Sequence, residues 1–296
     1  MGEGLIVALL CILGRLKIKT SDFSLISSRR NPLVRRLKAL SSPRGRNQSS
    51  MLLLEGTHLL SEALKTCRMP SEIVVTPQWL EENKEIFQAI SKEVQIHLVT
   101  KSVLEASVTT VSPDGVASLF PFSALPKNNN EATFILALDR LQDPGNLGTL
   151  FRTALAADVE LIWLALGADP LGQKVLRASA GAVMHLPFER LGSDEDNAIE
   201  ALSCKLKDAK LRGFQVLGAY APNTIIKTGL SPYWEIDWQK PTVLVLGNEG
   251  AGVHPKIQSC CTNAVTLPHN KIVESLNVAS DAVPLLLERL RARMTS

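Results

Sequence analysis

The most regular pattern in the second half of the chain is an alternation of short apolar runs with segments of helical spacing. Uninterrupted apolar runs at residues 134–138, 161–166 and 242–246 are typical of strands that are buried on both faces of a sheet. Helices are expected over 147–157 and 200–211, and further strands over 214–220 and 264–267. This alternation predicts an α/β domain built on a parallel sheet.

The first half of the chain has a similar but shorter alternation. Strands are expected over 51–54, 72–76 and 95–99, and helices over 32–40, 57–65, 77–92 and 101–107, with Thr57 as the cap of the second helix. Residues 44–50 are polar and positive and are expected to form a loop. We therefore predict a small α/β unit here.

Residues 120–131 lack periodicity and contain Pro121, Pro126 and three consecutive asparagines, which is typical of a linker. At 296 residues the chain exceeds the usual size of a single domain. The expected organisation is an N-terminal extension at 1–23, a first domain at 24–120, a linker at 121–131 and a second domain at 132–296.

Two polar loops follow apolar strands near the C-terminus. The strand at 242–246 runs into GNEGAG, and the strand at 264–267 leads through Pro268 to Glu274, Ser275 and Asn277 at the start of a long apolar helix. A buried strand that ends in a glycine-rich turn brings bare backbone groups to a ligand. Taken alone, a strand followed by glycines is most often an ordinary tight turn, so neither loop is decisive by itself.

A third loop, DRLQDPGN at 139–146, precedes the helix expected at 147–157. Asn146 is expected to cap that helix, and Arg152, nearly two turns later, to present its guanidinium beside the same loop. Without further context, Asn146 could be a plain N-cap and Arg152 a plain surface arginine.

The charge is distributed unevenly along the chain. Residues 15–46 contain ten Lys and Arg against Asp22 alone, a net charge of +9, whereas the whole chain carries +3, so the remainder carries −6. A basic segment of this kind is typical either of a polyanion-binding surface or of a solvated tail. Tyr233, Trp234 and Trp238 could likewise stack on RNA bases or pack at a domain edge.

Composition narrows the class of protein. A hydrophobic fraction of 45% with 21% charged residues is ordinary for a soluble globular protein, and no apolar run approaches the roughly 20 residues that span a bilayer. The apolar run at 5–13 followed by Arg15 is either the remnant of a targeting segment or a disordered or mis-started N-terminus. Five cysteines without CxxC spacing and scattered histidines predict reduced thiols in an intracellular compartment and no metal site.

Taken together, the three loops resemble the motifs of the SpoU (TrmH-like) RNA 2′-O-ribose methyltransferases of the SPOUT class. DRLQDPGNLGTLFRTALAADV resembles motif one, GNEGAG motif two, and LP with ESLN motif three. NPLVRRLKAL followed by LLLEGTHLLSEAL resembles the N-terminal substrate-binding domain of the family. The resemblance implies an α/β parallel-sheet domain with a deep trefoil knot, preceded by a small α/β/α RNA-binding domain that is similar to a ribosomal protein.

The same resemblance implies transfer of a methyl group from S-adenosylmethionine to a ribose 2′-hydroxyl of rRNA or tRNA. It also implies RNA as the partner, a homodimer formed through the C-terminal helix, no membrane and no metal. The location would be cytoplasmic, or a chloroplast or mitochondrion if the N-terminus is a transit segment. The small-residue helix at 174–188 is expected to lie near the active site.

The family motifs assign roles to eleven residues of this sequence. The resemblance implies catalytic roles for Arg152, Asn146, Glu249, Ser275 and Asn277. It implies cofactor binding by Gly247, Asn248, Gly252, Leu267, Pro268, Leu276 and Asn277.

Two departures from the family pattern keep a second function open. Residues 269–273 read HNKIV where relatives carry a methionine and a glycine, and the last helix contains Asp281 and Pro284. The alternative is therefore an RNA-binding relative that has lost methyl transfer. A nucleotide-dependent α/β enzyme is excluded, because no GxGxxG follows a predicted strand and no P-loop sequence occurs.

Overall fold

The computed structural model describes residues 24–128, 131–226, 229–270 and 272–294, so the expected extension at 1–23 lies outside the described residues. The chain forms two compact units. Unit 1 comprises Met1–Leu125 and Leu171–Met184, and unit 2 comprises Pro126–Pro170 and His185–Ser296. Unit 1 is thus made from two separate stretches of the chain.

The sheet of unit 1 has four strands in the order β1-β4-β2-β3. Strand β4 is antiparallel to both β1 and β2, and β2 is parallel to β3. The sequence analysis missed β4, although its apolar residues are buried between two neighbours. The strands are β1 (Met51–Glu55), β2 (Glu72–Val75), β3 (Gln95–Leu98) and β4 (Val116–Pro121).

Three expectations about the helices of unit 1 are wrong. The loop predicted at 44–50 is helical, because Ser42 caps it and the buried Arg46 donates to the carbonyls of Leu40 and Ser41. The single helix predicted at 77–92 is two short helices, and Gly56, not Thr57, is the cap of the helix that begins at Thr57. The helices are α2 (Pro32–Ala39), α3 (Pro43–Ser49), α4 (Thr57–Lys65), α5 (Pro77–Glu82), α6 (Lys84–Gln88) and α7 (Lys101–Glu105).

The second stretch of unit 1 packs on β1 and α4. It contains helix α9 (Gln173–Ala178), and the Gln173 side-chain amide donates to the Leu53 carbonyl at 2.8 Å. The guanidinium of Arg177 lies 3.4 Å from the buried carboxylate of Glu55. Gly181 lies against Glu62, where a Cβ would come within 2.6 Å of that side chain. Residues 171–184 therefore complete the core of this unit.

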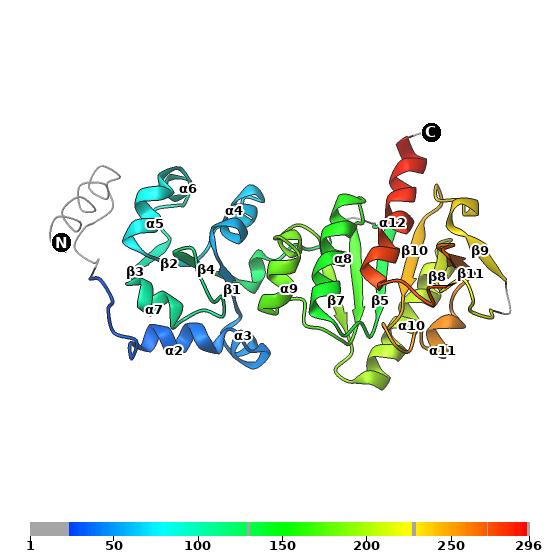
Figure 1. Ribbon diagram of the computed structural model, residues 1–296, viewed down its shortest axis with the longest axis horizontal. Coiled ribbons are helices and arrows are strands. Elements are labelled where there is room, and N and C mark those ends of the chain that lie inside the picture. Colours follow the sequence, from blue (N-terminus) through cyan, green and yellow to red (C-terminus); the bar gives the residue numbers. More distant parts are fainter. Residues whose placement is uncertain (1–23, 129–130, 227–228, 271, 295–296) are drawn as a thin grey trace. The chain divides into compact units, whose positions relative to one another are not determined.

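Unit 2 is built on a seven-stranded sheet in which every pair is parallel, in the order β7-β6-β5-β10-β8-β11-β9 (Figure 1). This confirms the predicted α/β fold with a parallel sheet. Strand β10 lies between β5 and β8, which both precede it in the chain. The strands are β5 (Phe134–Asp139), β6 (Leu161–Ala165), β7 (Phe188–Leu191), β8 (Gln215–Ala219), β9 (Leu230–Pro232), β10 (Thr242–Leu246) and β11 (Asn263–Thr266).

Helices cover this sheet on both faces. Alternate strand residues point to opposite faces, and on each face they pack against helices. Ile135 and Val243 share a core with α10 (Glu195–Leu211) and α11 (Pro255–Gln258). Phe134, of the opposite parity, lies under the guanidinium of Arg289 on α12 (Val278–Met294), which packs against α8 (Pro144–Ala156). Burial of both faces thus explains why the strand sequences are uninterrupted runs of apolar residues.

The buried Arg289 fixes the C-terminal half of helix α12 to the rest of unit 2. Its guanidinium donates to the carbonyls of Trp238, Lys240 and Thr133. The helix continues through Pro284, which lies inside it. Within the parts of the chain that the structure describes, no helix is both long and apolar enough to cross a membrane.

Candidate functional site

A pocket of about 980 Å³ opens where β5, β8, β10 and β11 reach their carboxyl ends in unit 2. Its walls come from the loop after β5, the glycine loop after β10, the segment between β11 and α12, and residues after β8. The change of strand order around β5 and β10 makes this the usual position for a ligand in an open parallel sheet.

Glu249 joins the glycine loop to the loop after β5. Its carboxylate accepts hydrogen bonds from the backbone N–H groups of Gln142 and Asp143, at 3.1 and 3.0 Å, and from the Asn146 amide at 3.2 Å. Burial acts to raise the pKa of Glu249, but the hydrogen bonds from the N–H groups of Asp143, Gln142 and Glu249 itself and from the Asn146 amide together lower that pKa. The carboxylate is therefore held in its charged form.

Asn277 extends this link to the third loop. Its amide donates to the side-chain oxygen of Asn146 at 2.9 Å, while its own oxygen accepts from the backbone N–H of Ala279 at the start of α12. Glu249, Asn146 and Asn277 thus form one chain of hydrogen bonds across three loops. Residues 146 and 277 are far apart in the sequence, so only the parallel sheet brings them together.

The glycine loop is closed on itself. Asn248 and Gly252 exchange two backbone hydrogen bonds of 3.0 and 2.9 Å, and the Asn248 side-chain oxygen accepts from Gly250 and Ala251. A Cβ on Gly247 would lie 2.3 Å from backbone atoms of Gly252 and Val253, so only glycine fits there. The loop therefore presents backbone to the pocket in a fixed form.

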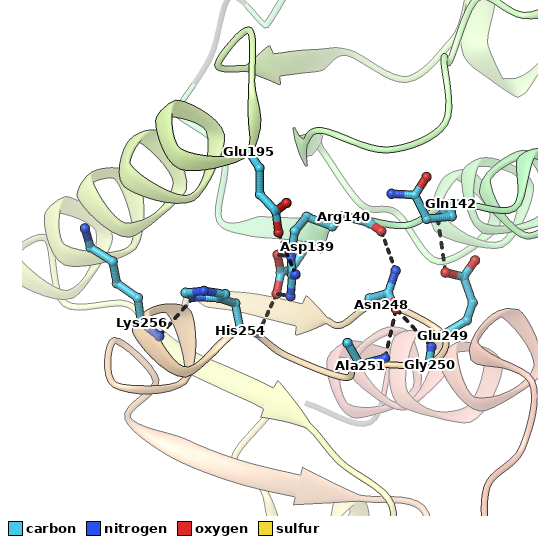
Figure 2. A network of polar contacts seen from close by, with 10 residues as sticks. All are labelled: Asp139, Arg140, Gln142, Glu195, Asn248, Glu249, Gly250, Ala251, His254 and Lys256. Carbon is cyan, nitrogen blue, oxygen red and sulfur yellow. Dashed lines mark hydrogen bonds and ion pairs between the residues drawn. The ribbon is translucent and has the colours of Figure 1, made fainter.

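A second polar network, which was not predicted from the sequence, supports the same loop (Figure 2). Asp139, fully buried at the end of β5, accepts from the backbone N–H of His254 at 2.6 Å and from Arg140 at 2.9 Å. Arg140 also pairs with Glu195 at 3.0 Å, and its carbonyl accepts from the Asn248 amide. The Asp139 hydrogen bond raises the pKa of Arg140, which fixes the positive charge.

The signal for this network was present in the sequence. An acidic residue that ends a run of buried apolar strand positions needs a partner, because an unpaired buried carboxylate is costly. Arg140 takes a left-handed backbone conformation with φ of 55°, which is uncommon outside glycine. The Arg140 backbone N–H donates to the Ala165 carbonyl at 2.9 Å.

Nine of the eleven residues assigned from the sequence line the pocket. These are Asn146, Gly247, Asn248, Glu249, Gly252, Leu267, Ser275, Leu276 and Asn277. The other two, Arg152 and Pro268, are not among the lining residues, and both are exposed. Arg152 lies on α8, and among the described residues its side chain has no hydrogen bond or ion pair.

Trp238 is buried and its indole donates to the Tyr233 carbonyl, so of the two uses open for it, packing holds and stacking on RNA bases does not. The expectation that Asn146 caps α8 is wrong, because the helix begins at Pro144 and the Asp143 carboxylate accepts from the Asn146 N–H at 2.7 Å. Asn146 is left free to use its side chain across the loops.

The geometry defines what this pocket can do. At the carboxyl ends of the strands, it presents the backbone groups of the closed glycine loop, an ionised carboxylate and amide side chains. Among the described residues, no group of three or more His, Cys, Asp or Glu is placed to hold a metal ion. Such a site is suited to gripping a ligand and orienting a polar reactant beside it.

Comparisons with known proteins agree with the motifs. The model of the SpoU rRNA Methylase family matches residues 133–287, and that of an MRM3-like substrate binding domain matches residues 31–118. An uncharacterized tRNA/rRNA methyltransferase of Synechocystis is 38% identical over 275 residues, which cover 92% of this chain and 95% of the relative. The 23S rRNA (guanosine(2553)-2′-O)-methyltransferase RlmP of Bacillus subtilis is 31% identical, over 90% of this chain and 98% of its own.

Solved structures give the same result. An rRNA methyltransferase from Sinorhizobium meliloti matches with a TM-score of 0.73 and 27% identity, over 92% of this chain and 98% of that one. Its AdoMet-bound form matches with a TM-score of 0.71 and 26% identity, over 93% of this chain and 99% of that one.

Proposed function

Because the chain belongs to the SpoU rRNA methylase family, we propose that it transfers a methyl group from S-adenosylmethionine to a ribose 2′-hydroxyl of an rRNA or tRNA. The observation that carries this proposal is the chain of hydrogen bonds that joins Glu249, Asn146 and Asn277 at the pocket. A relative acting on a ribose 2′-oxygen and a neighbour with AdoMet bound support the same chemistry.

The pocket fits S-adenosylmethionine in size and charge. Its volume of about 980 Å³ is at the upper end of the range for small-molecule sites. The described lining residues include Glu249 and Asp281 but no Lys, Arg or His, which suits a cofactor with a positively charged sulfur. We propose that the backbone at Gly247, Leu267 and Leu276, with Asn248, Gly252 and Pro268, holds it.

The bound cofactor supplies an activated methyl group, so the protein has to align the 2′-hydroxyl and help its proton to leave. We assign the alignment to Asn146, Ser275 and Asn277, with Glu249 holding the loops in register. Arg152 would stabilise the oxygen as it loses its proton. A guanidinium stays protonated, so phosphate or water would accept that proton.

Unit 1 is proposed to bind the RNA, as an α/β/α domain that resembles a ribosomal protein. The match of an MRM3-like substrate binding domain to residues 31–118 supports this role. Exposed cations on its α2, including Arg35 and Lys38, supply positive charge for phosphate. We propose residues 24–120 as this domain, 121–131 as the linker and 132–296 as the catalytic domain, from which residues 171–184 return to unit 1.

We also propose the trefoil knot and a homodimer. The insertion of β10 between two earlier strands supports a threaded chain at this end of unit 2. We propose that the dimer forms through the C-terminal helix, where Leu285 and Leu286 are buried within their own chain and so are not available to a second copy. Leu155, Val283 and Leu287 on the packed helices α8 and α12 are exposed by 36%, 37% and 39% and are better candidates.

The test is methyl transfer to RNA with radiolabelled S-adenosylmethionine, followed by alkaline hydrolysis. A 2′-O-methyl group blocks cleavage of the adjacent phosphodiester, so the label should appear in alkali-resistant dinucleotides. Label in mononucleotides would indicate base methylation and would contradict the proposed target. If the protein binds RNA but not S-adenosylmethionine, the alternative of a relative that has lost methyl transfer would hold.

A further inference from the structure

The described lining of the pocket is acidic. It contains four carboxylates, from Asp143, Glu249, Glu274 and Asp281, and no basic side chain. Asp143 caps α8 and Glu249 accepts three N–H groups, while Glu274 is exposed to water. Three of the four acidic groups therefore have donors or solvent to offset their charge.

Asp281 differs from the other three. It lies in the first turn of α12, lines the pocket, and its Oδ1 is enclosed without a hydrogen-bond partner among the described groups. Burial raises the pKa of Asp281, and His269 acts against this to a smaller extent. The N-terminal end of a helix favours a negative charge, which helps to keep the group ionised.

The Coulomb interaction between a carboxylate and another charge is stronger when the carboxylate is enclosed away from water and has no hydrogen-bond donor. Asp281 would therefore attract a positive charge that enters this pocket. The proposed reaction changes that charge. When the methyl group forms its bond to the ribose oxygen, the electrons of the broken sulfur–carbon bond stay on sulfur and the hydroxyl proton departs. The sulfur changes from a cation to a neutral thioether, so the product is one unit less positive than the substrate.

We propose that Asp281 makes this pocket selective by charge, so that it holds S-adenosylmethionine more tightly than S-adenosylhomocysteine. The inference rests on the proposed function and adds a role to it. The same group that favours loading of the cofactor would favour release of the product. Asp281 is suited to this because it is half-buried, whereas the charge of the exposed Glu274 is screened.

The experiment compares binding of the two ligands by calorimetry in the full-length protein. The wild type should bind S-adenosylmethionine about tenfold more tightly than S-adenosylhomocysteine, since a nearby unit charge of modest effective strength has an effect of this order. Asp281→Asn should reduce that ratio to near one, mainly by weakening S-adenosylmethionine. Asp281→Glu, which keeps the charge, should retain most of the preference.

Glu274→Gln is the matched control, because it removes one carboxylate charge from the same pocket at an exposed position. Its ratio should stay within about twofold of the wild type, as expected for a screened charge. If Asp281→Asn weakens both ligands equally, or leaves both unchanged while the variant is folded, the charge selectivity is wrong. If Asp281→Asn does not fold, the Asp281→Glu ratio decides, and loss of the preference there overturns the proposal.

Binding by the wild type distinguishes a failure of the charge selectivity from a failure of the proposed methyl transfer. Equal binding of both ligands would overturn the charge selectivity and leave the proposed methyl transfer standing. Binding of neither ligand would overturn the proposed function, and the selectivity with it.

Discussion

At the scale of single residues, Glu249 holds the site together by accepting three N–H donors from another loop. Removing the charge would leave the N–H groups of Gln142 and Asp143 with a weaker acceptor. Since hydrogen bonds to a charged group are about twice as strong as neutral ones, the state of this carboxylate controls how the loops meet.

This arrangement gives a pH dependence with a definite sign. The pKa of Glu249 is lower in the folded protein than its ordinary value of 4.5, so its contribution to stability is complete above about pH 4.5 and is lost as the pH falls through the folded pKa. We expect Glu249→Gln to be less stable than the wild type at pH 7, with a difference that shrinks toward pH 3. Urea unfolding at several pH values measures this, and a constant difference would contradict it.

Arg152 tests the chemistry itself. We expect Arg152→Ala to slow methyl transfer by about 100-fold, because a positioned cation that stabilises developing charge has effects of this size. S-adenosylmethionine affinity should change little, since Arg152 does not line the pocket. Arg152→Lys should not restore activity, as a point charge does not replace a planar fork. A near wild-type rate for Arg152→Ala would contradict the mechanism.

At this scale the resemblance to the SpoU family selected Asn146, Glu249 and Asn277, and the structure joins these three side chains by hydrogen bonds. Their catalytic roles stay a prediction. The sequence contained a signal for Asp139, an acidic residue at the end of a buried strand, but it could not name the partners of Asp139 and Arg140, because His254 and Glu195 are distant in the chain. Asn146 was also misassigned as the cap of α8. Asp143 is the cap, because Pro144, the residue after it, is suited to the first position of a helix.

At the scale of elements, long apolar strands were predictable and helix ends were not. Strand β10 was predicted correctly because every side chain in it is apolar or β-branched and both of its faces are buried. Helix α3 was missed, because its polar sequence owes its helical form to the Ser42 cap and to the buried Arg46. Strand β4 was taken in part for a linker, since a central strand next to prolines carries no periodicity.

The exposed apolar residues of α8 and α12 lead to a prediction about assembly. We expect Leu287→Asp to convert a dimer into a monomer, because a charge placed in a buried interface is left unpaired. Leu211→Asp is the control, since Leu211 is 88% exposed at the end of α10 and outside the proposed face. Light scattering gives the mass, and a wild type that is already monomeric at micromolar concentration would rule out the dimer.

At the scale of the whole molecule, the division of labour between the units can be tested without cutting the chain. Deleting residues 1–130 would expose Val175 and Leu176, which are buried in unit 1. Charge reversal on the surface of α2 avoids this problem. The double variant Arg35→Glu, Lys38→Glu should weaken RNA binding by about tenfold at low salt and less at higher salt.

The control for this experiment is Lys84→Glu with Lys92→Glu, two exposed lysines elsewhere in unit 1. It changes the net charge by the same amount away from α2. Filter binding to RNA and calorimetry with S-adenosylmethionine should show a loss of RNA affinity only for the α2 variant, with cofactor affinity unchanged in both. Equal losses in the two variants would show that net charge, and not the α2 surface, attracts RNA.

The return of the chain to unit 1 at Leu171–Met184 has a consequence for synthesis on the ribosome. Residues 126–170 are made between the two stretches, which takes roughly 2–9 s at ordinary elongation rates. During this interval the Leu53 carbonyl and the Glu55 carboxylate lack the partners that Gln173 and Arg177 provide. Nascent chains stalled before residue 171 should be cut by protease within residues 51–121, and chains stalled well after 184 should resist. Equal resistance would mean that the first stretch folds alone. Resistance that appears only after residue 184 would mean that unit 1 completes its fold only after part of unit 2 has been made.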